Sequence, residues 1–105
     1  MTKQLQQEID KIVHEIVTKY QPEKVILFGS AARGDVTEDS DFDFFIIKSN
    51  VPHLGRDRYY DLMKVIEYHH ASDFLICTPQ EVSARLAMGD PFISSIMTEG
   101  RVLHG

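Results

Sequence analysis

Residues 24–48 read KVILFGSAARGDVTEDSDFDFFIIK, in which two apolar segments flank a small-residue turn and a polar loop. The first segment, residues 24–28, is short and apolar, which predicts a buried strand. Residues 29–34 form a small-residue turn that opens a short helix, and residues 35–40 form a loop. The second segment, residues 41–48, is apolar on both faces after its first few residues. This pattern is typical of a strand in the middle of a sheet.

Apolar periodicity extends this pattern in both directions along the chain. Before the strand at 24–28, apolar residues recur at three- and four-residue steps, which predicts an amphipathic helix ending before Pro22. Prolines mark the first turns of two later helices, because proline is favoured there. The remaining expected elements are a helix over 5–20, a helix from 56 to about 69, a strand over 72–77, helices beginning at Pro79 and Pro91, and a short edge strand within 100–105.

Composition limits the chain to one small domain and disfavours some partners. The 105 residues are 43% hydrophobic, enough for one modest core, so we expect a single domain over residues 1–105. Eleven Lys and Arg against sixteen Asp and Glu give a net charge of -5, which disfavours long nucleic acid. The single Cys77 has no partner for an internal disulfide, and no apolar run is long enough for a signal core or a membrane span. We therefore expect a cytoplasmic protein that does not bind membranes.

Asp41 and Asp43 stand two residues apart at the start of the second strand, so their side chains project from the same face. Two adjacent carboxylates repel each other unless a cation or a proton lies between them, and Mg²⁺ prefers oxygen ligands. Taken alone, such a pair is more often a turn-capping aspartate followed by a solvated one. Its significance depends on its neighbours.

Gly29 and Ser30 follow directly after the first strand. Where side chains are small, backbone N–H groups and a hydroxyl can approach a phosphate closely. The alternative is an ordinary strand-to-helix turn with Ser30 as a cap. A phosphate cradle and a carboxylate pair on adjacent strands together provide what phosphoryl and nucleotidyl transfer require. The combination favours the catalytic interpretation over either motif alone.

The motifs GSAARG at 29–34 and SDFD at 40–43 resemble the signature of the DNA polymerase beta superfamily of nucleotidyltransferases. Within it, the chain is similar to the minimal nucleotidyltransferases that are often paired with HEPN-domain toxins. The resemblance covers residues 25–78, and residues 82–103 fit the usual tail. It implies an α+β nucleotidyltransferase fold with a small mixed β-sheet and helices packed mainly on one face. It also implies a third carboxylate at Asp73, a position that by sequence alone suits a solvent-facing aspartate equally well.

The same resemblance implies a mechanism and a partner. With two Mg²⁺ ions, the protein would move a nucleoside monophosphate, AMP from ATP, onto a hydroxyl of a partner protein. That partner would be a HEPN toxin, and the chain its antitoxin. Asp73 would complete the second metal site or act as the base. The implied catalytic and metal-binding residues are Asp41, Asp43 and Asp73, and the implied phosphate-binding residues are Gly29, Ser30 and Arg33.

Other interpretations stay open at this stage. The chain could be a catalytically silent antitoxin that caps its partner, or a transferase acting on a small molecule, although such enzymes carry an additional domain. The sequence does not identify the base of the nucleotide. It also does not determine the oligomeric state, and both a homo-oligomer and a hetero-oligomer stay open. His69 and His70 are expected at a helix end rather than as a metal pair, because adjacent residues point in different directions. Residues 92–103 are expected to pack in the core, with a partner-facing surface as the alternative.

Overall fold

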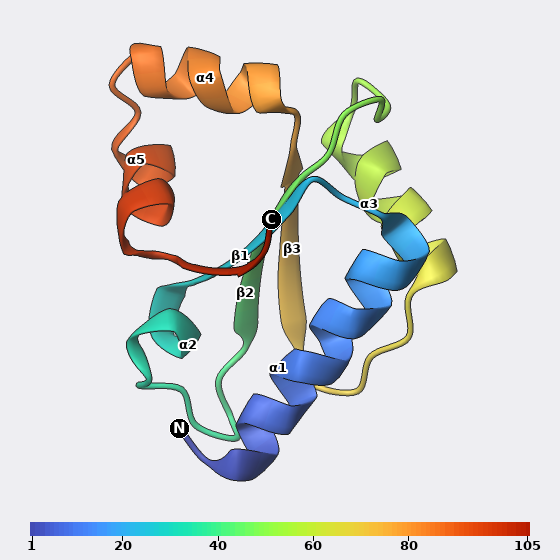
Figure 1. Cartoon of the computed structure of the whole chain (residues 1–105), viewed down its shortest axis with the longest axis vertical. Helices are drawn as coiled ribbons and strands as arrows, with labels where there is room; N and C mark the ends of the chain where they lie inside the picture. The colour runs from blue at the N-terminus through green and yellow to red at the C-terminus, as the bar shows by residue number, and fades with distance from the viewer.

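The computed structural model describes residues 1–105 as a four-stranded sheet flanked by helices (Figure 1). Its strand order is β3-β2-β1-β4; β2 and β3 are parallel, and the other pairs are antiparallel. The predicted mixed sheet, the α+β class and the C-terminal edge strand are confirmed. The helices are α1 (Lys3–Glu15), α2 (Gly29–Arg33), α3 (Gly55–Val65), α4 (Pro79–Ala87) and α5 (Pro91–Glu99), with a π-helical turn η1 (Ile16–Tyr20), and the strands are β1 (Lys24–Phe28), β2 (Phe42–Ile47), β3 (Ser72–Cys77) and β4 (Arg101–His104).

The two faces of the sheet are covered unequally. Alternate residues of β2 face opposite sides, so Phe44 and Ile46 join one core cluster while Phe45 and Ile47 join another. The first cluster has 15 buried residues and lies against α1, η1 and α3. The second has six and lies against α4 and α5. The helices therefore pack mainly on one face, as expected, and the other face is only partly covered. None of the helices is long and apolar enough to cross a membrane.

The N-terminal helix buries the predicted apolar stripe but changes its hydrogen-bonding pattern near the end. The α-helical part stops at Glu15, and the chain continues as one wide turn to Tyr20. This turn closes with the Gln21 N–H donating to the carbonyl of Ile16, five residues back, at 3.2 Å. Gln21 then takes a left-handed conformation with φ of 57°, which ends the helix before Pro22. The predicted span was helical, although its last turn is not α-helical.

The second long helix is shorter than predicted, because α3 ends at Val65 and not near His69. Ile66 takes an extended conformation with φ of -104° and ψ of 154°, which directs its buried side chain into the larger core. The next N–H, of Glu67, donates to the Glu15 carboxylate at 2.9 Å instead of continuing the helix. The prediction that His69 and His70 lie at a helix end was therefore wrong. Both lie in the connection to β3.

Arg58 of α3 is the one charged side chain in the buried set, and it joins three parts of the chain. Its guanidinium donates to both carboxylate oxygens of Glu81 on α4, at 2.7 and 3.1 Å. It also donates to the backbone carbonyls of Pro52, His53 and Ile76. This network holds α4 against the edge of the sheet. The sequence offered no signal for it, because Arg58 stands in a polar run.

Candidate active site

The turn between β1 and α2 requires glycine for two reasons. Gly29 has φ of +69°, a conformation that favours glycine. A Cβ at this position would also collide with the carboxylate of Asp43 on the neighbouring strand. Phe28, the last residue of β1, pairs directly with Asp43 in the antiparallel register. The absence of a side chain at Gly29 therefore keeps the space beside Asp43 open.

Gly34 provides a matched control for this close approach. Its φ is +79°, but a Cβ there would meet nothing within 4 Å. We expect Gly34→Ala to cost about 1 kcal/mol, the backbone penalty alone. Gly29→Ala should cost more than Gly34→Ala, because the added Cβ also forces the Asp43 carboxylate to turn away. Urea denaturation measures both costs, and equal losses in the two variants would contradict the role given to the contact between Gly29 and Asp43.

The three predicted aspartates lie at one end of the sheet. Asp43 of β2 pairs directly with Asp73 of β3 in the parallel register, and Asp41 stands just before β2. By strand alternation Asp41 and Asp43 share the face occupied by α4 and α5. Asp41 and Asp73 are exposed, whereas Asp43 is half-buried. Burial raises the pKa of Asp43, and the nearby carboxylates of Asp73 and Asp41 raise this pKa further.

These carboxylates suit a hard cation in chemistry, but they do not form a preassembled cluster. No three acidic, His or Cys side chains converge in the geometry of a metal site. The donors are carboxylate oxygens, which Mg²⁺ prefers, and the like charges around Asp43 carry a cost that a bound cation would remove. Binding would require Asp41 and Asp73, which are exposed and free to rotate, to turn toward Asp43. The metal-ligand assignment of these residues stays a prediction.

His70 supports the loop that leads into the carboxylates. Its ring stacks on Phe42 with centroids 3.9 Å apart and planes 15° apart. Its Nε2 lies 2.7 Å from the carbonyl oxygen of Ser40, the residue before Asp41. We infer that His70 holds the start of β2 in place. Its contacts are with Phe42 and the backbone, as expected of a structural histidine.

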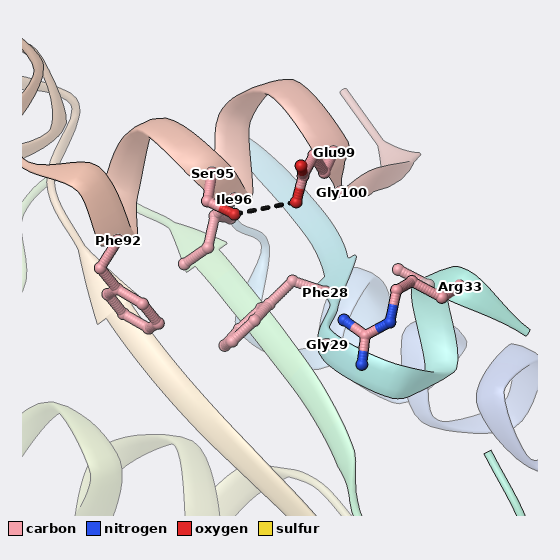
Figure 2. A pocket seen from close by; sticks show the side chains of 9 residues that line it. Phe28, Gly29, Arg33, Phe92, Ser95, Ile96, Glu99 and Gly100 are labelled. Atoms are coloured by element: carbon pink, nitrogen blue, oxygen red, sulfur yellow. Dashed lines mark hydrogen bonds between the residues drawn. The ribbon is translucent and has the colours of Figure 1, made fainter. Parts of the chain in front are cut away.

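A pocket of about 240 Å³ opens beside this turn, between α2 and α5. Figure 2 shows Arg33 and Gly29 on one side of it and Phe92, Ser95 and Glu99 on the other. Arg33 is exposed, and its Nε lies 3.4 Å from an oxygen of Asp35, also exposed, so this surface ion pair is weak. The Arg33 guanidinium is therefore available to an anion at the pocket.

A family comparison agrees with this geometry. The sequence profile of a family described as "Nucleotidyltransferase domain" matches residues 9–104. The chain belongs to this family. The matched region contains every element that builds the site, from β1 to α5, so the chain is a nucleotidyltransferase.

Individual relatives and a solved structure support the assignment. Two nucleotidyltransferase relatives from Methanocaldococcus jannaschii are each called "Putative protein adenylyltransferase". One is 31% identical over 91% of this chain and 94% of its own length, and the other is 27% identical over 97% and 73%. A crystal structure described as a "putative nucleotidyltransferase" from Sulfolobus solfataricus shares the fold, with a TM-score of 0.56. It is 24% identical and covers 80% of this chain and 81% of its own.

The candidate site contains residues that the sequence predicted and residues that it did not. The structure brings Gly29 into contact range of Asp43 and pairs Asp43 with Asp73. Ser30 lies in the first turn of α2, and Arg33 lies at the pocket. The contribution of α5 was missed. A signal existed in the spacing of its residues, since positions three and four apart share a helix face. The α5 residues that line the pocket are Phe92, Ser95, Ile96 and Glu99.

Proposed function

We propose that this nucleotidyltransferase moves AMP from ATP, with Mg²⁺, onto a hydroxyl of a partner protein in the cytoplasm. The single observation that carries the proposal is the environment of Asp43. Its carboxylate is half-buried and near enough to Asp41 and Asp73 to be affected by their charges, and it lies beside the turn at Gly29, where an added Cβ would collide with it. Such an arrangement is unfavourable without a cation and favourable with one.

Different residues of the chain would bind the metal ions and the phosphates. Asp41, Asp43 and Asp73 would hold two Mg²⁺ ions, which when bound neutralise triphosphate charge and lower the pKa of the attacking hydroxyl. The backbone N–H groups and hydroxyl at Gly29 and Ser30 would bind the β- and γ-phosphates. Arg33 would neutralise further phosphate charge.

The transfer is an in-line displacement at the α-phosphorus. The acceptor oxygen forms a bond to the α-phosphorus, and the bond from that phosphorus to the α–β bridging oxygen breaks. Pyrophosphate leaves. The proton of the hydroxyl passes to solvent or, if Asp73 acts as the base and not as a metal ligand, to Asp73. The chain supplies binding, orientation and charge, with little covalent chemistry of its own.

A protein acceptor is supported by the names of the two relatives and by the partly covered face of the sheet. Both relatives are called protein adenylyltransferases. The sheet face that carries Asp41 and Asp43 is only partly covered by α4 and α5, which leaves it accessible to a large acceptor. The resemblance noted from the sequence extends the proposal to a HEPN-domain toxin as the partner. In this role the chain would be an antitoxin that neutralises the toxin by adenylylation.

The test incubates the purified protein with Mg²⁺, nucleotides labelled at the α-phosphate and the product of the neighbouring gene. We expect Mg²⁺-dependent label on that product from ATP, and loss of its toxicity in cells. Asp43→Asn should remove both effects. If the variant protects cells as well as the parent and no label appears, the chain is a silent binding antitoxin. Label recovered only on a small molecule would instead make it a small-molecule transferase.

A further inference from the structure

The pocket between α2 and α5 lies where a nucleotide held at Asp43 would extend. Phe28 lines this pocket and is the direct register partner of Asp43. Gly29, which also lines the pocket, approaches the Asp43 carboxylate closely enough to exclude a Cβ. The pocket and the carboxylates therefore adjoin, and one ligand can occupy both.

Aromatic side chains form the apolar wall of this pocket. Phe28 and Phe92 meet edge to face, with ring centroids 5.9 Å apart and planes at 83° (Figure 2). Phe92 is 53% exposed, unusual for a phenylalanine beside a core, so much of its ring is free. Exposed aromatic rings beside phosphate-binding groups provide stacking surfaces for nucleobases. Phosphate groups do not stack on aromatic rings, so this wall would contribute to binding of the base and not of the phosphates.

The α5 side of the pocket is unsuited to phosphate because it carries Glu99. The hydroxyl of Ser95 donates to the carboxylate of Glu99, with 3.0 Å between Ser95 Oγ and Glu99 Oε2. An ionised carboxylate only accepts hydrogen bonds, so Glu99 would repel a phosphate but accept from an amino group. Arg33 lies on the other side of the pocket, next to Gly29, as Figure 2 shows. Charge thus separates a phosphate side on α2 from a base side on α5.

We propose that this pocket binds the nucleobase, with Phe92 stacking on the ring and Glu99 accepting a hydrogen bond from an exocyclic amino group. Among purines, the pocket would favour adenine over hypoxanthine, which has a carbonyl oxygen in place of the amino group. The proposal rests on the proposed function, because it takes the phosphates to lie at Gly29 and Asp43. It assigns the choice of base to α5.

Equilibrium binding of ATP and inosine triphosphate, each with Mg²⁺, tests the proposal without an acceptor. The parent should bind ATP about tenfold more tightly than inosine triphosphate, the effect of one hydrogen bond. Glu99→Gln should bring the two affinities close together, because an amide can also donate to the carbonyl oxygen. Phe92→Ala should weaken both by roughly tenfold, and Phe92→Leu, which keeps an apolar side chain without a ring, should also weaken both.

The possible failures are distinguishable. Glu99 is exposed, so Glu99→Gln should keep the thermal stability of the parent. The Phe92 variants lose the contact with Phe28 but should stay folded at the assay temperature, because about half of this side chain is exposed. Equal binding of the two triphosphates by the parent, or an equal change for both in Glu99→Gln, would overturn the base assignment and leave the proposed function standing. No binding of either triphosphate by the parent would overturn both proposals.

Discussion

Asp43→Asn is expected to reduce nucleotidyl transfer by about a thousandfold or more while making the metal-free protein more stable at neutral pH. Activity falls because the amide keeps the shape of Asp43 but cannot hold a cation. Stability rises because burial and the carboxylates of Asp73 and Asp41 hold the pKa of Asp43 above its ordinary value of 3.8. An ionised Asp43 therefore costs stability, and the neutral amide removes that cost.

The sign of this effect fixes its pH dependence. Because the folded-state pKa is raised, the folded protein loses stability as the pH rises from the ordinary range of an aspartate through that higher pKa. The stability difference between Asp43→Asn and the parent should thus be small near pH 4 and larger at pH 7. Thermal unfolding without divalent ions measures it. Adding Mg²⁺ should stabilise the parent and leave the variant unchanged.

Asp39→Asn is the matched control, since Asp39 is an exposed aspartate in the loop before the site. It should leave transfer, stability and the response to Mg²⁺ unchanged. If Asp43→Asn kept its transfer activity, or were less stable than the parent at pH 7, the role proposed for the Asp43 carboxylate would be contradicted.

The second large effect concerns Arg58. Replacing it by Met should lower the free energy of unfolding by about 3 kcal/mol, toward the low end for a buried pair, because Glu81 is 43% exposed. The loss combines the two bonds to Glu81 with those to the carbonyls of Pro52, His53 and Ile76. Urea denaturation of the variant measures it. Arg56→Met, at an arginine 77% exposed, should change little.

The same ion pair predicts acid sensitivity. Hydrogen bonds from Arg58 lower the pKa of Glu81 from 4.5 to about 2. A lowered carboxylate pKa contributes stability that is present above pH 4.5 and lost as the pH falls toward 2. Glu81→Gln should therefore cost stability at pH 7 and progressively less toward pH 2. A cost independent of pH would show that packing, and not the ion pair, holds α4 in place.

The bounds of some strands could be predicted from the sequence because they depend on the apolar pattern of neighbouring residues. The bounds of β1 and β3 were predicted correctly, since a continuous or alternating apolar run identifies a strand. The end of α3 was not, because Ile66 leaves the helix to fill the core and Glu67 bonds to the distant Glu15. Those contacts join residues far apart in the chain, and no local pattern encodes them.

In the candidate site, too, the features set by local sequence could be predicted and those set by contacts between distant segments could not. The Gly29 turn and the Asp41 and Asp43 pair were visible as motifs, whereas Asp73 depended on resemblance to a family. Its place opposite Asp43 follows from the parallel register of β2 and β3, which a sequence does not reveal. The pocket on α5 depends on how that helix packs over β1, and so Phe92 and Glu99 were not assigned any role in nucleotide binding.

The most direct test of nucleotidyl transfer compares ATP labelled at the α-phosphate with ATP labelled at the γ-phosphate, using the purified protein, Mg²⁺ and the neighbouring gene product. We predict that the partner acquires label from the α-phosphate alone, with one pyrophosphate released per label and none with Asp43→Asn. Label from the γ-phosphate, or no label from either ATP, would contradict the account.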